Sequence, residues 1–204
     1  MNTFGPLDYG KVYHIFNRGV NKIDLFRTHA NYKYFLHQYN NYIEPVVDTF
    51  AWCLMKNHFH FLVRVKTLDE IFQNLSGHYP PDRLQRVTPS RQFSHFFNAY
   101  TKAFNKQEKR EGALFERPFK RKVVDNEEYY RQLVIYIHQN PVHHKVCESA
   151  DDYPWTSFPA FLSLKPTNVA REKVMGWFDS IIAFKKLHRK TVSNNDLMRY
   201  LMEI

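Results

Sequence analysis

The chain has 204 residues, enough for one generous domain or for one domain with an appendage. Hydrophobic residues make up 44% of it, which supports a sizeable core, and 29 lysines and arginines against 20 acidic residues give a net charge of +9. This charge favours a polyanionic partner, with nucleic acid as the first candidate and an anionic membrane surface as the second.

Composition also excludes several classes of protein. There is no run of 18 apolar residues, so we expect no membrane-spanning segment. The first residues lack the basic start and the apolar stretch of a signal peptide. Two cysteines, Cys53 and Cys147, are too few for a disulfide framework. We therefore expect a cytoplasmic protein.

The chain opens with signals for a strand and then a helix. Residues 11–17 are typical of a strand, with Val12, His14 and Phe16 on one face. In residues 31–43, apolar side chains recur at three- and four-residue steps, which predicts an amphipathic helix.

Residues 50–65 predict a tight β-hairpin. Two apolar runs, 50–55 and 59–65, are separated by a two-residue turn, and Asn57 is a residue type that favours the backbone conformation of such a turn. Side chains alternate along a strand, so His58 and His60 lie on the face opposite the apolar side chains of the second run. Because the first run is apolar on both faces, we expect it to be a central strand.

His58 and His60 are candidate metal ligands. On a strand, residues two apart stand about 6–7 Å from each other, so two imidazoles can bind one divalent ion. The alternative is a pair of polar residues on a solvated face, since the chain has 11 histidines and a chance pair is unsurprising. Two observations favour the metal site: the preceding strand is apolar, and a helix further along the chain carries side chains that could complete the site.

The middle of the chain contains a loop, a helix and a basic strand. We interpret residues 66–89, which Gly and Pro interrupt, as a loop insertion with a brief helix, and residues 90–110 as a helix whose aromatic stripe packs in the core. Residues 114–124 predict a strand that is either a solvated basic edge or a track for a nucleic-acid backbone. The DNA-binding candidates are Arg18, Lys22, Arg64, Arg117, Lys120, Arg121 and Lys122.

A further helix, capped by Asp125 or Asn126, carries the side chains that could complete the metal site. It is predicted to run to about Asn140 and to be ended by Pro141. At about 100° per residue, Tyr136 and Asn140 can point into one site. His138 is rotated by about 160° around the helix from Tyr136 and cannot join them. Beyond it we predict a C-terminal helical appendage over 161–204, with one helix over 174–184 and another over 196–202.

Tyr136 is a candidate nucleophile. A phenol with a pKa near 10 is a poor nucleophile in water, but beside a metal-polarised phosphate it can attack phosphorus and hold the strand as a phosphotyrosine. His58 and His60 would supply two ligands and Asn140 a neutral oxygen. Imidazole would tolerate zinc, but a phosphate-handling site with open positions suits Mg²⁺ or Mn²⁺.

Four motifs, in this order along the chain, resemble the single-tyrosine HUH transposases, and most closely those associated with repetitive extragenic palindromes (REP). They are Tyr13–Gly19, Trp52–Val63, Arg117–Arg121 and Tyr136–Val142. The resemblance covers roughly residues 8–160 and implies an α+β, ferredoxin-like or RRM-like antiparallel sheet of about four or five strands flanked by helices. We expect this domain over 1–160, with 66–89 as its insertion.

The resemblance also implies an activity: cleavage and rejoining of single-stranded DNA beside a hairpin formed by an imperfect palindrome. His58 and His60 match the family's metal ligands, Asn140 its third ligand and Tyr136 its nucleophile. Attack by Tyr136 would give a 5′-phosphotyrosine and a free 3′-OH, with Mg²⁺ or Mn²⁺ as cofactor and a monomer or homodimer as the acting species.

Two other functions stay open. The chain could be a catalytically inactive or domesticated hairpin-DNA-binding protein, although the four intact site residues argue against lost chemistry. It could also be a metal hydrolase of small phosphoesters, which would not need the charge of +9. The candidates for reading the DNA are the 17–22 turn, the 66–89 loop and the appendage. In the loop, the side chains suited to stacking or phosphate contact are Phe72, His78, Tyr79, Arg83 and Arg86.

Overall fold

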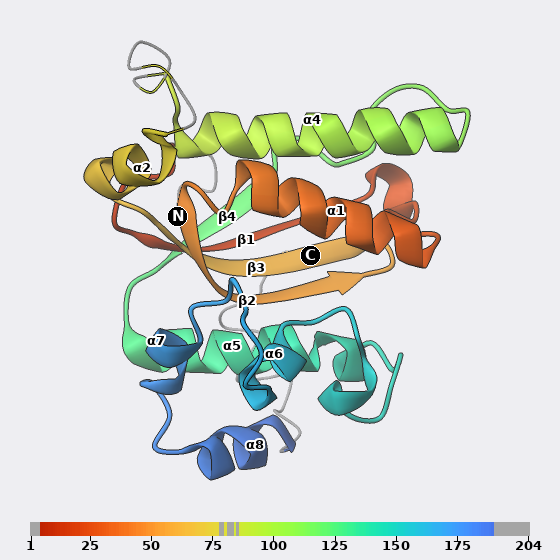
Figure 1. Ribbon diagram of the computed structural model, residues 1–204. Helices are drawn as coiled ribbons and strands as arrows, with labels where there is room; N and C mark the ends of the chain where they lie inside the picture. Colours follow the sequence, from red (N-terminus) through yellow and green to blue (C-terminus); the bar gives the residue numbers. More distant parts are fainter. Residues whose placement is uncertain (1–4, 78–79, 81–83, 85, 190–204) are drawn as a thin grey trace.

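Four strands form an antiparallel sheet in the computed structural model, which describes residues 5–77, 80, 84 and 86–189 (Figure 1). The strands are β1 (Val12–Arg18), β2 (Val47–Met55), β3 (His58–Val65) and β4 (Lys120–Val124), and their order across the sheet is β2-β3-β1-β4. The helix α1 (His29–Tyr42) joins β1 to β2, and α4 (Pro89–Gln107) precedes β4. This β-α-β-β-α-β order is that of a ferredoxin-like sheet, so the predicted α+β fold is confirmed.

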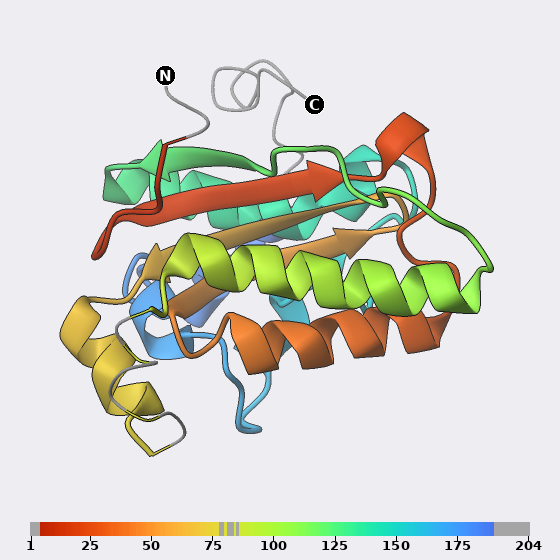
Figure 2. The same ribbon diagram turned by 90° about the horizontal axis from the view of Figure 1, so that it is seen from above.

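One face of the sheet is covered by α1 and α4, which lie side by side (Figures 1 and 2). The Thr28 side chain caps α1 by accepting a hydrogen bond from the Asn31 N–H. Pro89 begins α4, where its missing N–H would have no helical partner. The core beneath these helices is aromatic and includes the fully buried Phe35, Phe59, Phe61, Phe96 and Tyr100. The predicted apolar face of the β3 strand is therefore confirmed.

The opposite face is covered by α5 (Glu127–His143), whose first turn is capped by the Asn126 side chain. Its apolar residues pack with those of β1, β2 and β3 into a second core. Three shorter helices follow: α6 (Phe158–Leu162), α7 (Arg171–Met175) and α8 (Ile181–Arg189). The remaining elements are α2 (Leu68–Leu75) and two 3₁₀ turns, η1 (Val20–Lys22) and η2 (Ala150–Asp152).

The strand β2 lies at an edge of the sheet, so the prediction of a central position is wrong. It is apolar on both faces because a helical layer covers each of them. Its outer edge is also covered, since Ser157 N–H donates to Trp52 O at 2.9 Å, Leu54 N–H to Trp155 O at 2.9 Å and Ala170 N–H to Thr49 O at 2.9 Å. Segments after α5 thus occupy backbone groups that an open edge would expose.

Two predicted boundaries also differ from the structure. The helix α5 continues through Pro141 to His143, because in the last turn a proline removes one hydrogen bond without breaking a long segment. The basic strand is shorter than 114–124: β4 begins at Lys120, after the cis Arg117–Pro118 bond.

The C-terminal region contains more breaks than its hydrophobic pattern predicts. The helix expected over 174–184 is two helices, because α7 ends at Met175, before Gly176, and α8 begins only at Ile181. The helix predicted over 196–202 lies outside the described residues. Cys53 is buried and Cys147 half-buried, and both thiols are free. None of the helices within the described ranges is long and apolar enough to cross a lipid bilayer.

Candidate active site

The predicted site residues meet where β3 faces α5. The two-residue turn after β2 starts β3 at His58, so His58 and His60 point to the α5 side, away from the aromatic core. Tyr136 and Asn140 are one helical turn apart on α5 and face the histidines. All four side chains are buried: His60 and Asn140 are 0% exposed, His58 6% and Tyr136 7%.

Asn140 connects the nucleophile candidate to the histidine pair. Its Nδ2 donates to the Tyr136 hydroxyl oxygen at 3.0 Å, and its Oδ1 lies 3.0 Å from His58 Nε2. On the other side of the ring, His58 Nδ1 is 2.7 Å from Asn57 Oδ1. If the proton of His58 is on Nδ1, donated to Asn57, then Nε2 and Asn140 Oδ1 face each other with lone pairs. That arrangement favours a cation between them.

His60 is positioned by a residue on the neighbouring strand. His14 of β1 is 1% exposed, and its Nε2 lies 2.9 Å from His60 Nδ1. One proton is shared in this contact. When His60 Nδ1 carries it, His60 Nε2 presents a lone pair, and this buried Nε2 has no hydrogen-bond partner within the described residues.

Burial sets the charge of these groups. It lowers the pKa of His58 to about 4 and the pKa of His60 well below its usual value, because the charged imidazolium loses its water. Both imidazoles are therefore neutral near pH 7, which is the form that binds metal. Burial raises the pKa of the Tyr136 phenol, while the hydrogen bond from Asn140 acts in the opposite direction.

Three donor atoms could hold a divalent ion: His58 Nε2, His60 Nε2 and Asn140 Oδ1. The 3.0 Å between His58 Nε2 and Asn140 Oδ1 is also the spacing of adjacent ligands, about 3 Å, around an octahedral ion with bonds of about 2.1 Å. Nowhere in the described ranges do three His, Cys, Asp or Glu side chains form such a group, and the third donor atom in this set is the amide oxygen of Asn140. The unpartnered His60 Nε2 supports the fit.

Four nearby residues were not singled out from the sequence. His14 and Asn57 contact the two histidines directly, as described above. The ring of His143 stacks on Tyr136 with centroids 5.7 Å apart, and the ring of His144 lies 4.9 Å from His58. Alternation places His14 on one face of its strand, but the contact depends on β1 lying beside β3. His143 and His144 follow Pro141, where the helix was expected to have ended.

Two basic candidates adjoin the site. Arg18 forms an ion pair with Glu116 at 2.5 Å, and its register partner across the sheet is His58. Arg18 and Lys120 line a narrow cavity together with His58.

The other basic candidates are more dispersed. Arg117 and Arg121 line a larger cavity, and Lys22 is exposed in η1. Lys122 lies over the ring of Tyr129 at 5.8 Å. Arg64 is not brought to the site: it is at the other end of β3, in ion pairs with Asp48 and Glu70.

In the 66–89 insertion, the expected brief helix is α2, which buries Ile71 and Leu75. Of the side chains proposed to read DNA, Phe72 packs against the first core and Arg86 is exposed. The predicted contacts of His78, Tyr79 and Arg83 lie outside the described residues.

Comparisons with known proteins address the class of protein. No family model matches the chain. A protein of Haemophilus influenzae named as a REP-associated tyrosine transposase is 26% identical over 113 residues, which are 54% of this chain and 58% of that protein. A solved REP-associated tyrosine transposase bound to a REP hairpin matches with a TM-score of 0.61 and 18% identity, over 83% of this chain and 91% of that one.

Fold and comparisons together place the chain in a class of mixed α+β proteins that resemble tyrosine transposases. Within this class it is similar to the REP-associated tyrosine transposases, which confirms the resemblance seen in its motifs. The sequence match spans a little over half of the relative's length, and the structural match shows the shared fold.

Proposed function

We propose that the protein is a metal-dependent endonuclease and strand transferase that cleaves single-stranded DNA next to a hairpin through Tyr136. The observation that carries this proposal is the chain of contacts Tyr136–Asn140–His58, each about 3.0 Å long, with the unpartnered Nε2 of His60 beside it. It unites a nucleophile with three neutral donor atoms in one buried site. A structural tyrosine would not require a pair of neutral imidazoles facing an amide oxygen.

The chain's own residues prepare the nucleophile. Asn140 donates a hydrogen bond to the Tyr136 oxygen, which favours the phenolate over the phenol. The same Asn140 side chain also contacts His58, so it holds the Tyr136 hydroxyl close to the histidine pair. Bound Mg²⁺ or Mn²⁺ would be held by His58, His60 and Asn140 and would stabilise the negative charge that develops on the phosphate.

The proposed step is a transesterification. The Tyr136 oxygen loses its proton to water and forms a bond to phosphorus, while the bond between phosphorus and the 3′ oxygen breaks. The 3′ oxygen takes up a proton and leaves as a free 3′-OH, and the 5′ side of the strand stays on Tyr136 as a phosphotyrosine. Attack by another 3′-OH reverses the step and rejoins strands without an external energy source.

A hairpin-bearing strand is the proposed substrate. The solved transposase with the same fold was bound to a REP hairpin. In this chain, Arg18 and Lys120 lie beside His58, where they can neutralise the backbone of a strand whose phosphate reaches Tyr136.

A covalent-adduct assay tests the proposed function. Wild type incubated with a hairpin-bearing single-stranded oligonucleotide and Mn²⁺ should give a protein–DNA adduct that survives denaturing electrophoresis. Tyr136→Phe, which removes the nucleophilic oxygen, should give none and should still bind the DNA. Tyr130→Phe, on the same helix, is the matched control and should behave as wild type. Binding without an adduct in all three proteins would instead support the inactive hairpin-binding alternative.

A further inference from the structure

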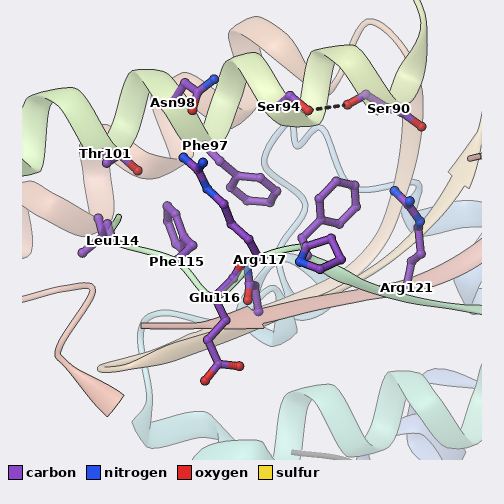
Figure 3. Close-up of a pocket in the computed structure, with 13 residues that line it drawn as sticks. Ser90, Ser94, Phe97, Asn98, Thr101, Leu114, Phe115, Glu116, Arg117 and Arg121 are labelled. Atoms are coloured by element: carbon purple, nitrogen blue, oxygen red, sulfur yellow. Dashed lines mark hydrogen bonds between the residues drawn. The ribbon is translucent and has the colours of Figure 1, made fainter. Parts of the chain in front are cut away.

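A cavity of about 670 Å³ lies between α4 and the segment that leads into β4 (Figure 3). We call it the Phe97 groove, after the aromatic residue at its centre. Its volume is within the range of about 300–1,000 Å³ that is typical of sites for small organic groups. The mechanism proposed above does not use it.

One wall of the Phe97 groove is polar. Ser90, Ser94, Asn98 and Thr101 are spaced by four, four and three residues along α4, so they form a stripe on one helix face. Ser94 and Asn98 are exposed. Ser94 Oγ donates to the Ser90 carbonyl at 3.1 Å and Ser90 Oγ accepts from the Leu7 N–H at 3.3 Å, so Asn98 and Thr101 are the side chains that can offer donors and acceptors to a ligand.

The other walls are aromatic and basic. Phe97, Phe115 and Phe119 line the groove, and Arg121 lies over the Phe119 ring at 4.6 Å. Figure 3 shows the Arg117 side chain extending from its loop toward α4. Within the described part of the chain Arg117 forms no hydrogen bond or ion pair. Aromatic faces, hydrogen-bonding side chains and a guanidinium are together the features that bind an unstacked nucleobase.

The groove is next to the candidate active site. Asn17 and Glu116 line both the Phe97 groove and the narrow cavity that contains His58, Arg18 and Lys120. Asn17 Nδ2 donates to the Glu116 carbonyl at 2.9 Å, which fixes the boundary between the two cavities. A strand that passes from His58 toward β4 therefore brings its neighbouring nucleotide to the groove.

We propose that the Phe97 groove holds one unpaired base of the DNA strand, close to the phosphate that Tyr136 attacks. This rests on the proposed function and deepens it, because chemistry at phosphorus does not distinguish bases and a separate site must do so. The base packs against the half-buried Phe119 and the small exposed parts of Phe97 and Phe115, and Asn98 and Arg117 contact its polar edge. The groove thereby helps to choose the position of cleavage.

Binding measurements without metal test the groove. The probes are a fluorescent hairpin with a single-stranded flank, the same DNA with an abasic site at each flank position in turn, and the hairpin alone. For wild type, one abasic position should weaken binding about ten-fold, since stacking of a base on an aromatic ring is worth about that much. If no abasic position weakens binding, the proposal is overturned.

A groove-filling variant provides the second arm. Asn98→Trp, at an exposed position, should weaken binding of the flanked DNA about ten-fold and leave the hairpin alone unaffected. Lys102→Trp, exposed on the same helix but outside the groove, is the control. In Asn98→Trp the sensitive abasic position should cause no further loss, because both changes remove the same contact.

The outcomes separate this proposal from the proposed function. If the loss caused by Asn98→Trp and the loss caused by the sensitive abasic position simply add, the groove is rejected even if Tyr136 forms adducts. The same holds if Asn98→Trp binds the flanked DNA as tightly as wild type. Conversely, the expected binding pattern would stand even if the adduct assay failed. Circular dichroism confirms that each variant is folded, and Ser94→Trp replaces Asn98→Trp if the latter is not.

Discussion

At the residue scale, the candidate site depends on which ring nitrogens carry protons. His14 contacts His60 Nδ1 at 2.9 Å, and Asn57 contacts His58 Nδ1 at 2.7 Å. Each contact can accept the Nδ1 proton and so leave Nε2 with a lone pair for the proposed metal ion. Ligating histidines usually have such a partner on the second nitrogen, which fixes the ring and raises its basicity.

The first prediction concerns His14. His14→Phe should keep the ring volume but remove the acceptor, and Mn²⁺ affinity should fall about 10- to 100-fold. Isothermal titration calorimetry measures this without any DNA. Nitrogen-15 spectra of the metal-free protein should also show His60 losing its fixed tautomer. His37→Phe, at an exposed position on α1, is the control, and equal Mn²⁺ affinity in both variants would contradict the positioning role.

At the element scale, α8 is joined to α5 by a buried chain of hydrogen bonds. His188 Nδ1 lies 2.8 Å from the Phe184 carbonyl, so it carries a proton and its Nε2 accepts. His138 Nδ1 then donates to that Nε2 at 2.9 Å, and the Ser157 hydroxyl donates to His138 Nε2 at 2.8 Å. Both imidazoles are neutral in this chain, since a second proton on either ring would displace one partner.

The second prediction follows from these protons. Burial lowers the pKa of His188 to about 4, from the usual value of about 6.5. Below pH 6.5 the unfolded state binds a proton that the folded state resists, so stability falls as pH drops from about 6.5 toward 4. In urea unfolding at pH 7 and pH 5, His188→Gln should lose about 2 kcal/mol less than wild type over this interval.

Other buried histidines also lower the stability as the pH drops. The informative quantity is therefore the difference in pH dependence between wild type and His188→Gln. His37→Gln, at an exposed site, should retain the full wild-type pH dependence. An identical dependence in His188→Gln would show that the His138–His188 contact does not titrate with unfolding.

The elements also show which features can be predicted from sequence. Alternation in β3 and the helical period in α5 are local, and they correctly group His58 with His60 and Tyr136 with Asn140. The order of strands is not local, so the contact from His14 and the edge position of β2 could not be predicted. An apolar strand indicates only that its faces are covered, and here the covering of its edge comes from residues over 100 positions away.

At the scale of the whole molecule, the second helical layer joins the C-terminal region to the rest of the fold. Val169 pairs with Thr49 at the edge of β2, and α8 packs against α5, which carries Tyr136. The division into a domain over 1–160 and an appendage over 161–204 stays a prediction. The contacts show that residues of both parts contribute to the second core.

The third prediction concerns the charge of +9. DNA binding should weaken steeply with salt, because phosphate contacts release counterions. Arg18→Gln and Lys120→Gln, at the two basic residues beside His58, should each reduce the log–log salt slope by about 0.7, the value for one phosphate contact with a single strand. Lys33→Gln, exposed on α1 and lining neither of the two cavities, is the control. A wild-type slope near zero would contradict an electrostatic interface.

The most direct test of the central claim is to identify the residue and the DNA end in the covalent adduct. A hairpin oligonucleotide carrying different fluorophores on its two sides is incubated with wild type and Mn²⁺, and the adduct is digested and sequenced by mass spectrometry. The account predicts that the DNA is attached to Tyr136, that the fragment on the 3′ side of the break stays bound through its 5′ phosphate, and that the other fragment ends in a 3′-OH. Attachment at another residue, retention of the opposite fragment, or cleavage without any adduct would contradict it.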